Sequence, residues 1–467
     1  MNSVKRIHLM GIGGVGMSGV AWILLEKGIP VSGSDIAPSP RTKRLEKKGA
    51  EIFYGHSPEN LKNVGLVIIS SAITEDNPEL RAARKRKIQV WHRSNMLGEI
   101  LSDGHGICVA GTHGKTTTSG MLSLILETAD LDPTVLIGSE MDAFNGNAKF
   151  GCGGLIVAEA DESDGSFLNY QPEYALITNL EAEHMSHYES EASLQKAFRD
   201  FLSQVKTSGS ALLCADDPGL RNILDIEPPC RVAFYSLKIP LADYYGGEIC
   251  LHPLSSTFNA YARGRKLGRV ELPVPGKHNV SNAVAAIGMA HQLGVKFEHI
   301  RKGLSLFHGT RRRFQIKGRR NGITVIDDYA HHPTEVAATL RAALPLKASQ
   351  KGRIITIFQP HRYSRTLEMA ELFSGAFYDS DIVIITDVYA AGERPIEGVS
   401  GKNVFDALTM GGHPNVIYVP QLKDVPEKIE HLVVPGDIIF TMGAGDVWKT
   451  GESLLIRLGI LCTESLK

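Results

Sequence analysis

The sequence lacks the features that mark membrane-spanning and nucleic-acid-binding proteins. Its 50 Lys and Arg residues are balanced by 51 Asp and Glu residues, and the formal net charge is -1. No overall field therefore attracts nucleic acid or an anionic membrane, so any anion site must be local. No apolar run reaches the roughly 18 residues that a transmembrane helix needs. We expect neither a nucleic-acid partner nor membrane insertion.

Cysteine is also scarce, and no two cysteines form a CxxC pair. The chain has six, at positions 108, 152, 214, 230, 250 and 462. Scattered cysteines of this kind are typical of reduced thiols in a cytosolic protein, and they do not predict a zinc site. Residues 1–6 lead directly into a strand-like run at 7–10 and do not resemble a signal peptide. We therefore expect a cytoplasmic protein.

What the sequence does contain is a repeated alternation of short apolar runs and helix-like stretches. With 467 residues the chain is too long for one ordinary core, so two or three domains are expected. Hydrophobic residues make up 43% and charged residues 22%, which is ordinary for a globular protein. The pattern predicts an α/β fold.

The strongest motif is a phosphate-binding loop at residues 109–118, between a strand-like run at 107–110 and a helix-like stretch. Backbone N–H groups at a helix N-terminus attract phosphate. Lys115 would add a charge for the β- and γ-phosphates, and Thr116 or Thr117 a hydroxyl for Mg²⁺. The strict G-x-x-x-x-G-K-[ST] pattern is not met, because Val109 stands at its first glycine and the glycine is at 111. The alternative is an ordinary strand–helix turn with an exposed lysine.

A second glycine-rich turn, at residues 11–16, matches G-x-G-x-x-G and has Asp35 about 20 residues further on. The glycines allow a diphosphate to approach the backbone, and Asp35 would accept hydrogen bonds from a ribose or a base. This pattern predicts a nucleotide diphosphate and does not identify a nicotinamide. A purely structural turn remains an alternative. Residues 70–73 follow another strand-like run, where open α/β sheets bind ligands.

Carboxylates follow the strand-like run at 155–158. We favour Glu159 as a Mg²⁺ ligand because it directly follows this run, although an acidic surface loop is the alternative. A helix opening at 277–283 carries amides and an imidazole that would read an adenine edge or cap the helix. Three arginines at 311–313 would clamp a triphosphate or be solvated.

A third α/β unit begins near residue 322. Clusters of His, Arg, Asp, Tyr and Gly stand after its strand-like runs, at residues 329–333, 359–366, 387–393 and 443–446. The carboxyl ends of parallel strands meet at one edge of a sheet, so these clusters predict one shared crevice.

Taken together, the motifs at 11–19, 111–118, 327–335, 358–366 and 387–393 resemble those of the bacterial Mur ligases. The resemblance covers nearly the whole chain and implies a three-domain α/β fold. It implies a UDP-sugar-binding Rossmann-like domain at 1–103 and a central P-loop-type ATPase with a mainly parallel sheet at 104–318. The third domain implied, at 319–467, is a Rossmann-like, amino-acid-binding one.

The same resemblance implies an activity and its partners. It implies an ATP-dependent ligase of peptidoglycan synthesis that uses Mg²⁺ and joins L-alanine to the carboxylate of UDP-N-acetylmuramate through an acyl phosphate. One alternative is a ligase that adds a preformed peptide to the same sugar. A nicotinamide-dependent oxidoreductase and a non-catalytic nucleotide-binding regulator are less favoured. No oligomeric state is predicted.

The resemblance also implies roles for individual residues. The implied ATP-binding residues are Gly111, Thr112, His113, Gly114, Lys115, Thr116, Thr117, His278, Asn279, Asn282, Arg313 and Asp328. The implied UDP-sugar-binding residues are Gly11, Gly13, Gly14, Gly16, Met17, Ser18, Asp35, Ser70, Ser71 and Ala72. The implied amino-acid-binding residues are His331, His361, Arg362 and Arg365, and the metal ligands are Thr116, Glu159 and His184. Lys115, His331 and Arg313 are the implied catalytic residues.

One position departs from the family's pattern. Many relatives have Asp-His-x-Asp where this chain has Glu183-His184-Met185-Ser186. The ligands of a second metal ion are therefore left unassigned, and we give Lys196 no role as a carbamylated lysine.

Overall fold

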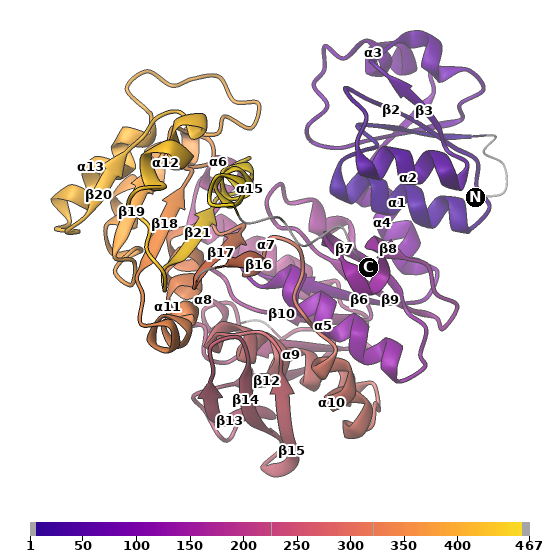
Figure 1. Cartoon of the computed structure of the whole chain (residues 1–467). Coiled ribbons are helices and arrows are strands. Elements are labelled where there is room, and N and C mark those ends of the chain that lie inside the picture. Colours follow the sequence, from indigo (N-terminus) through magenta and orange to yellow (C-terminus); the bar gives the residue numbers. More distant parts are fainter. Residues whose placement is uncertain (1–5, 226, 321, 460–467) are drawn as a thin grey trace. The chain divides into compact units, whose positions relative to one another are not determined.

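The computed structural model describes residues 6–225, 227–320 and 322–459, and it is an α/β protein with three β-sheets (Figure 1). Internal contacts divide the chain into two compact units. The first unit comprises residues 1–247, 259–270 and 281–307, and the second comprises residues 248–258, 271–280 and 308–467. Residues 1–5, used above to predict that no signal peptide is present, and Cys462 lie outside the described residues.

The first sheet is parallel and has the strand order β3-β2-β1-β4-β5. Its strands are β1 (Ile7–Met10), β2 (Val31–Asp35), β3 (Glu51–Tyr54), β4 (Leu66–Ile69) and β5 (Gln89–His92). Its helices are α1 (Val15–Glu26), α2 (Pro40–Lys48), η1 (Pro58–Leu61), α3 (Pro78–Lys85) and α4 (Arg93–Ser102), with α1 and α2 side by side (Figure 1). The strand order reverses between β1 and β4, which is where open α/β sheets bind ligands. Residues 11–16 and 70–73 follow these two strands, so both predicted segments reach that crevice.

The second sheet has the order β15-β14-β13-β12-β11-β10-β6-β9-β7-β8. Its first strands are β6 (His105–Ala110), β7 (Thr134–Met141), β8 (Gly146–Lys149), β9 (Leu155–Glu159) and β10 (Tyr174–Ile177). The others are β11 (Ser210–Cys214), β12 (Arg231–Ser236), β13 (Tyr244–Leu251), β14 (Ser256–Ala262) and β15 (Arg265–Leu272). Strand β6 pairs in parallel with β9 and β10, whereas β7 and β8 form an antiparallel hairpin.

The helices along this stretch are α5 (Lys115–Thr128), η2 (Asp142–Phe144), η3 (Ser166–Asn169), α6 (Met185–Tyr188), α7 (Glu191–Ser203), α8 (Pro218–Arg221), α9 (Lys277–Gln292) and α10 (Phe297–Ser305). Helix α5 follows β6 directly, so the predicted phosphate loop is the strand–helix turn at 111–114.

The third sheet has the order β16-β17-β21-β18-β19-β20, and only its edge pair β16–β17 is antiparallel. Its strands are β16 (Gln315–Arg320), β17 (Ile323–Asp328), β18 (Ile354–Phe358), β19 (Ile382–Ile385), β20 (Val416–Tyr418) and β21 (Ile438–Met442). Its helices are α11 (Pro333–Gln350), α12 (Tyr363–Met369), η4 (Ala370–Gly375), α13 (Gly401–Met410), η5 (Leu422–Asp424), α14 (Val425–Ile429) and α15 (Trp448–Arg457). The three sheets agree with the predicted three-domain fold, while the predicted borders at 103 and 318 stay predictions.

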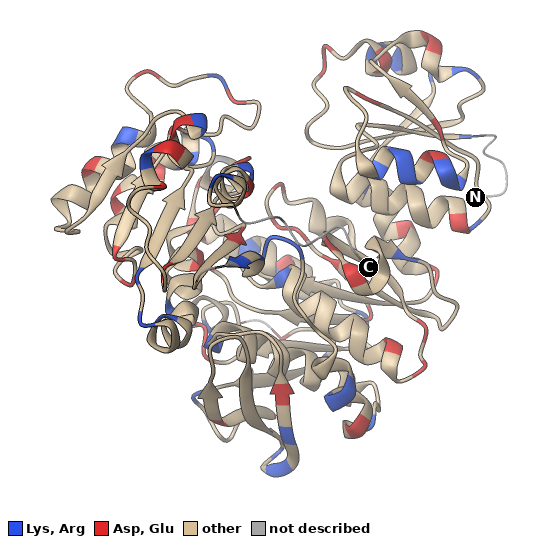
Figure 2. Cartoon of the chain, viewed as in Figure 1, with Lys and Arg blue, Asp and Glu red and all other residues tan. Residues whose placement is uncertain are grey.

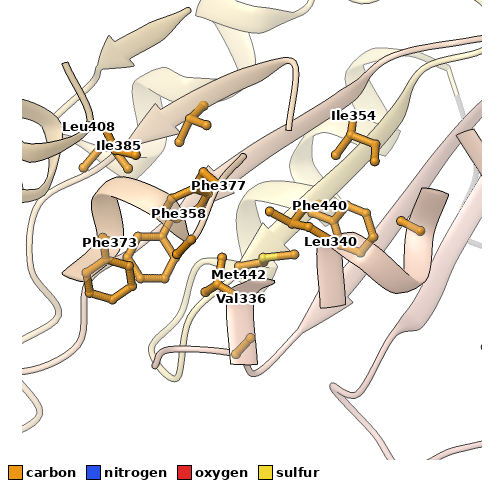
Figure 3. Close-up of a cluster of buried hydrophobic side chains, with 14 of the residues drawn as sticks. Val336, Leu340, Ile354, Phe358, Phe373, Phe377, Ile385, Leu408, Phe440 and Met442 are labelled. Carbon is orange, nitrogen blue, oxygen red and sulfur yellow. The ribbon is translucent and has the colours of Figure 1, made fainter. Parts of the chain in front are cut away.

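The core of the third sheet explains why its strands are continuous apolar runs. Parallel strands covered by helices on both faces are buried on both faces. Phe358 at the end of β18 packs on Phe373 and Phe377, with ring centroids 5.0 and 5.2 Å apart (Figure 3). Its neighbour Ile357 points into a second cluster together with Ile439. Packing on both faces holds the strand ends from which the polar clusters extend.

The surface carries charges of both signs. Figure 2 shows Lys and Arg interspersed with Asp and Glu along both units, as the balanced composition predicted. Among the described residues, no helix is both long and apolar enough to cross a membrane. The described cysteines, Cys108, Cys152, Cys214, Cys230 and Cys250, are all free thiols.

Candidate functional site

The loop between β6 and α5 has a backbone that requires glycine. Gly111 has a φ of +122° and Gly114 a φ of +83°, both in the region that disfavours side chains. A Cβ atom on Gly111 would lie 2.2 Å from Thr178 Oγ1, and one on Gly114 would lie 2.7 Å from Asn282 Oδ1. The loop is therefore packed tightly from outside, and Asn282 lies against it.

Asn179, just after β10, fixes the middle of this loop. The Thr112 backbone N–H donates to Asn179 O at 3.2 Å, and that of His113 donates to Asn179 Oδ1 at 2.8 Å. Thr112 is buried, and His113 Nε2 lies 3.3 Å from Glu181 Oε2. The loop is thus held by the residues that follow the neighbouring strand.

Lys115, the first residue of α5, has an anionic partner within the protein. Its Nζ lies 2.8 and 3.1 Å from the two carboxylate oxygens of Glu162 and 2.5 Å from Gly111 O. The Glu162 side chain is 1% exposed. Burial alone would lower the pKa of Lys115, but Glu162 and its acidic neighbours raise it above its usual value. Burial raises the pKa of the Glu162 carboxyl, and the Lys115 ammonium offsets only part of this effect.

Sequence reasoning gave Glu162 no role, although it noted the acidic run that contains it. A buried ammonium group needs a counter-ion close by. This requirement could have identified the partner, because it predicts that one carboxylate of the acidic run faces Lys115. Tyr188 strengthens the arrangement by donating its hydroxyl to the Glu162 carbonyl oxygen at 2.5 Å.

Thr116 and Glu159 form a pair of oxygen ligands beside the loop. Thr116 Oγ1 donates to Glu159 Oε2 at 3.1 Å, and the Gly138 N–H donates to Glu159 Oε1 at 2.5 Å. Thr117 is buried, so of the two threonines it is Thr116 that faces the carboxylate. Burial raises the pKa of Glu159, an effect that a cation bound there would oppose. A hydroxyl and a carboxylate are ligands that Mg²⁺ accepts, so these two residues fit the implied metal ion.

His184 lies in a different group of acidic side chains. Its Nε2 is 3.7 Å from Glu162 Oε1 and 3.8 Å from Glu183 Oε2. His184 has a φ of +60° and immediately precedes α6. The structure thus groups His184 with Glu162, the partner of Lys115, whereas Glu159 is grouped with Thr116.

Helix α9 carries all three residues predicted to lie near adenine. Asn282 contacts the phosphate loop, as described above. Asn279 is buried, and its Nδ2 donates to Pro275 O at 2.7 Å, so this amide holds the turn before the helix. His278 is exposed.

A pocket of about 630 Å³ lies at the carboxyl ends of β1 and β4. The predicted residues that line it are Gly11, Gly13, Gly14, Gly16, Met17, Asp35, Ser70 and Ala72. The lining also includes Val15 and Ile73 of the two predicted segments, and residues that sequence reasoning did not select, namely Ile36, Ser39, Arg41, His56, Thr74, Asn77 and Arg93. The first sheet therefore brings both predicted segments to one cavity.

Two predicted side chains do not line this pocket. Ser18 is buried within α1, and its hydroxyl donates to Val15 O at 2.9 Å. The Ser71 hydroxyl bonds to Asp164 and lies 3.1 Å from His92 Nε2. Both hydroxyls are used within the protein.

Asp35 holds the glycine turn in place. Its Oδ2 accepts the Gly13 N–H and its Oδ1 accepts the Ile36 N–H, both at 2.7 Å. The acidic residue at the end of β2 therefore fixes the backbone of the glycine turn, and its contact with a ribose or base stays a prediction.

A buried carboxylate stands behind the pocket residue His56. Glu79 Oε2 lies 2.8 Å from His56 Nδ1 and accepts the Ser34 hydroxyl at 2.5 Å. Burial opposes ionisation of Glu79, but hydrogen bonds from His8, His56, Ser34 and Asn60 lower its pKa to about 2. An ionised, fully buried carboxylate thus fixes the orientation of the His56 ring. Sequence reasoning missed His56 and Glu79 because the two lie far apart along the chain.

In the second unit, two of the three adjacent arginines have distinct partners. Arg312 Nε lies 3.0 Å from Asp327 Oδ2, and its Nη2 donates to Gly443 O at 2.6 Å. Arg313 Nη1 lies 3.3 Å from Glu335 Oε1. Arg312 therefore joins β17 to the loop after β21, whereas Arg313 pairs with Glu335 on α11.

Asp328, at the end of β17, organises the backbone around Arg313. Its Oδ2 accepts the Phe314 N–H at 2.7 Å and its Oδ1 accepts the Ala330 N–H at 2.8 Å. Burial raises the pKa of Asp328 to about 6. The contacts of Arg313 and Asp328 with ATP stay predictions.

The predicted amino-acid-binding residues gather at the ends of β17 and β18. The rings of His331 and His361 are 5.7 Å apart, and Arg365 Nη1 lies 3.3 Å from His361 Nδ1. His361 also stacks on Tyr389, with ring centroids 5.8 Å apart. Burial, and then the charges of His331 and nearby arginines, lower the pKa of His361 to about 3. His361 is therefore neutral near pH 7, and three of the four predicted residues form one cluster.

His331 differs from His361 because it has an acidic neighbour. Its Nδ1 lies 2.9 Å from Tyr329 O and 3.3 Å from Glu335 Oε2. Glu335, which sequence reasoning did not select, thus contacts both His331 and Arg313.

Arg362 is placed by an unusual backbone. It has a φ of +67°, it donates its N–H to Tyr389 O at 2.8 Å, and its side chain is exposed. Helix α12 begins one residue later, at Tyr363. Arg362 therefore lies just before the helix that carries Arg365.

Comparison with family models covers most of the chain. Residues 6–105 match "Mur ligase family, catalytic domain", residues 109–290 match "Mur ligase middle domain", and residues 312–445 match "Mur ligase, glutamate ligase domain".

Curated relatives match along nearly their whole length. A protein of Pelotomaculum thermopropionicum named UDP-N-acetylmuramate--L-alanine ligase is 48% identical and covers 98% of both chains. A protein of the same name from Geobacter sp. is 45% identical and covers 97% of this chain and 98% of its own.

Solved structures give the same picture. The UDP-N-acetylmuramate-alanine ligase of Thermotoga maritima superposes with a TM-score of 0.82 at 30% identity, covering 97% of this chain and 99% of its own. A murein peptide ligase of Psychrobacter arcticus has a TM-score of 0.71 at 26% identity, covering 98% and 99%.

Proposed function

The chain belongs to the Mur ligase family, and from this we propose that it joins L-alanine to the carboxylate of UDP-N-acetylmuramate as ATP is converted to ADP and phosphate. The observation that carries this proposal is the full-length likeness to proteins named for that reaction. The reaction is a step of peptidoglycan precursor synthesis. We place it in the cytoplasm, where its nucleotide substrates are made.

The phosphate loop supports the first half of the reaction. A carboxylate is a poor electrophile, so the sugar carboxylate attacks the γ-phosphorus of ATP and forms an acyl phosphate, with ADP as the leaving group. Such transfers depend mainly on positioning and on neutralising charge. Lys115 supplies a cation at the loop, and the first turn of α5, to which the N-cap residue gives no side-chain hydrogen bond, offers backbone N–H groups beside it.

A divalent cation would supply further charge neutralisation at the phosphates. Thr116 and Glu159 are the residues that would hold it, because their oxygens already lie 3.1 Å apart beside the loop. His184 remains a candidate through its place beside Glu162.

The cluster at the ends of β17 and β18 supports the second half. The amine of L-alanine attacks the acyl carbon, and phosphate leaves. The attacking amine must lose a proton, and we assign its acceptance to His331, whose pairing with Glu335 supports this role. Arg365 is the cation we assign to the alanine carboxylate, because neutral His361 leaves the arginine as the charged member of their contact.

Two other activities would use parts of the same structure. A ligase for a preformed peptide would share the fold and the phosphate chemistry, and the murein peptide ligase structure is such a relative. Its 26% identity to this chain is below the 48% of the Pelotomaculum alanine ligase and the 30% of the Thermotoga one. A nicotinamide-dependent oxidoreductase would use the glycine turn and would leave the phosphate loop without a role.

The deciding experiment measures ADP release with UDP-N-acetylmuramate while each amino acid, and then a tripeptide, is supplied in turn. We expect release that depends on the sugar nucleotide and is fastest with L-alanine. Faster release with the tripeptide would favour the peptide ligase. Tight binding of NADH, seen as enhanced nicotinamide fluorescence, together with no ADP release, would overturn the proposal.

A further inference from the structure

The glycine turn at the nucleotide-sugar pocket has few backbone donors left for a ligand. Its successive N–H groups donate within the protein, namely Gly11 and Ile12 to Ser34 O, Gly13 to Asp35 Oδ2, and Gly14 to Gly11 O. A bound diphosphate therefore meets mainly the first turn of α1, where helical N–H groups lack intrahelical partners. Two negative charges in one pocket need further positive charge from side chains.

Arg41 supplies such a charge at the rim of the pocket. It lies in the first turn of α2, a helix rich in Lys and Arg (Figure 2), and its side chain lines the cavity. Its Nε donates to Gly13 O at 2.7 Å, which places the guanidinium directly against the glycine turn. A guanidinium has five N–H groups, and this contact uses one of them.

Glu140 holds the same guanidinium from another sheet. Its Oε1 lies 3.3 Å from Arg41 Nη1, and the two side chains are 23% and 34% exposed. Glu140 belongs to β7, in the sheet that carries the phosphate loop. The hairpin partner of β7 touches the turn as well, because Asn147 Nδ2 donates to Val15 O at 2.7 Å. Arg41 is thus fixed at one end by the glycine turn and at the other by Glu140.

We propose that Arg41 binds the diphosphate of the UDP-sugar and that Glu140 positions it for that task. The proposal rests on the proposed function and adds a specificity-determining residue to its sugar-nucleotide site. After the contacts with Gly13 and Glu140, further N–H groups of Arg41 are available for phosphate oxygens, which arginine binds in a planar, bidentate manner. A partly exposed ion pair contributes only about 0–1 kcal/mol to stability. Linking the two sheets therefore does not by itself explain why Arg41 and Glu140 are paired at this pocket.

The experiment uses the full-length enzyme and measures the KM of each of the three substrates separately. We expect Arg41→Ala to raise the KM for UDP-N-acetylmuramate about tenfold or more, while the KM values for ATP and alanine and the kcat change less than about twofold. Arg41→Lys keeps the charge without the planar fork and should give an intermediate KM. Lys43→Ala, which removes the same charge from an exposed position on the same helix, is the matched control and should leave all three KM values unchanged.

A charge swap separates ligand binding from a tether. Arg41→Glu combined with Glu140→Arg keeps an ion pair between α2 and β7 but turns a carboxylate toward the diphosphate. We expect the KM for the sugar nucleotide to stay at least tenfold raised in this double variant. Restoration of the wild-type KM by the swap, or a normal KM in Arg41→Ala, would overturn the proposal.

A calorimetric titration with UDP alone tests this inference separately from the proposed function. Wild-type protein that binds UDP, with at least tenfold weaker binding by Arg41→Ala, supports the role of Arg41 even if no ADP release is found. Equal affinity of both proteins for UDP overturns the role of Arg41 and leaves the ligase activity untouched.

Discussion

Replacing Lys115 by Met tests both the phosphate loop and its buried counter-ion. Met keeps the length of the side chain and has a similar helix propensity, but it removes the cation. Loss of charge stabilisation at transferring phosphates costs about 3–4 kcal/mol, so we expect turnover to fall by roughly two to three orders of magnitude. ADP release under saturating substrates measures this loss.

The same substitution leaves the Glu162 carboxyl buried without its cation. Removing one partner of a buried pair typically destabilises a protein by about 3–5 kcal/mol while the remaining group stays ionised. Burial already raises the pKa of Glu162, and loss of Lys115 raises it further. A carboxyl whose native pKa is raised contributes stability at pH values below its unfolded pKa, and this contribution is lost as the pH rises through the native pKa. Lys115→Met should therefore be nearly as stable as wild type near pH 5 and clearly less stable at pH 9.

The assay is the thermal midpoint of the full chain at both pH values. A second variant, Lys115→Met with Glu162→Gln, removes the unpaired carboxyl and should recover most of the midpoint at pH 9 without recovering turnover. Near-normal turnover of Lys115→Met would refute the phosphate-loop assignment. A double variant as unstable as the single one would refute the argument from burial.

Three further outcomes are expected. Arg365→Lys should raise the KM for L-alanine at least tenfold, about 1.4 kcal/mol, with little change for ATP; a raised KM for ATP alone would move Arg365 to the nucleotide site. Burial lowers the pKa of His361 to about 3, so the unfolded chain binds a proton there that the folded protein does not bind. The free energy of unfolding should therefore decrease as the pH falls below the unfolded pKa near 6.5, by about 2 kcal/mol at pH 5. His361→Gln should accordingly lose less of its thermal midpoint between pH 7 and pH 5 than wild type loses, and an equal loss would contradict the assignment. Asp437→Asn should lower the thermal midpoint by several degrees, because its buried carboxylate accepts Arg353 Nε at 3.1 Å and Nη2 at 2.7 Å, whereas Asp406→Asn in an exposed pair should not.

The strands and the turns that bear the site were predictable from the sequence for a physical reason. A parallel strand buried on both faces must be a continuous apolar run, and the polar residue that ends the run marks the carboxyl edge of the sheet. Glu159 at the end of β9 and His361 shortly after β18 were found in this way. The glycine turns were found because only glycine tolerates their backbone, as Gly111 shows.

The partners of these residues were not predictable in the same way. Glu162 contacts Lys115 across 47 residues of sequence, and Arg41 contacts Glu140 across 99. Such pairs depend on which strands become neighbours, and local spacing does not encode that. Arg362 shows the same limit at short range, because it has a positive φ, donates its N–H to Tyr389 O, and lies before the helix that begins at Tyr363.

Strand β7 fixes the distance between two contacts, one with Glu159 and one with Arg41. Gly138 bonds to Glu159 beside the loop after β6, and Glu140, two residues further along, pairs with Arg41 at the pocket proposed to bind the sugar nucleotide. An extended chain advances about 3.3 Å per residue, so these two anchor points are about 7 Å apart. Insertion or deletion of a single residue between them would turn the Glu140 side chain to the opposite face of the strand. This short segment is therefore expected not to tolerate a change of length.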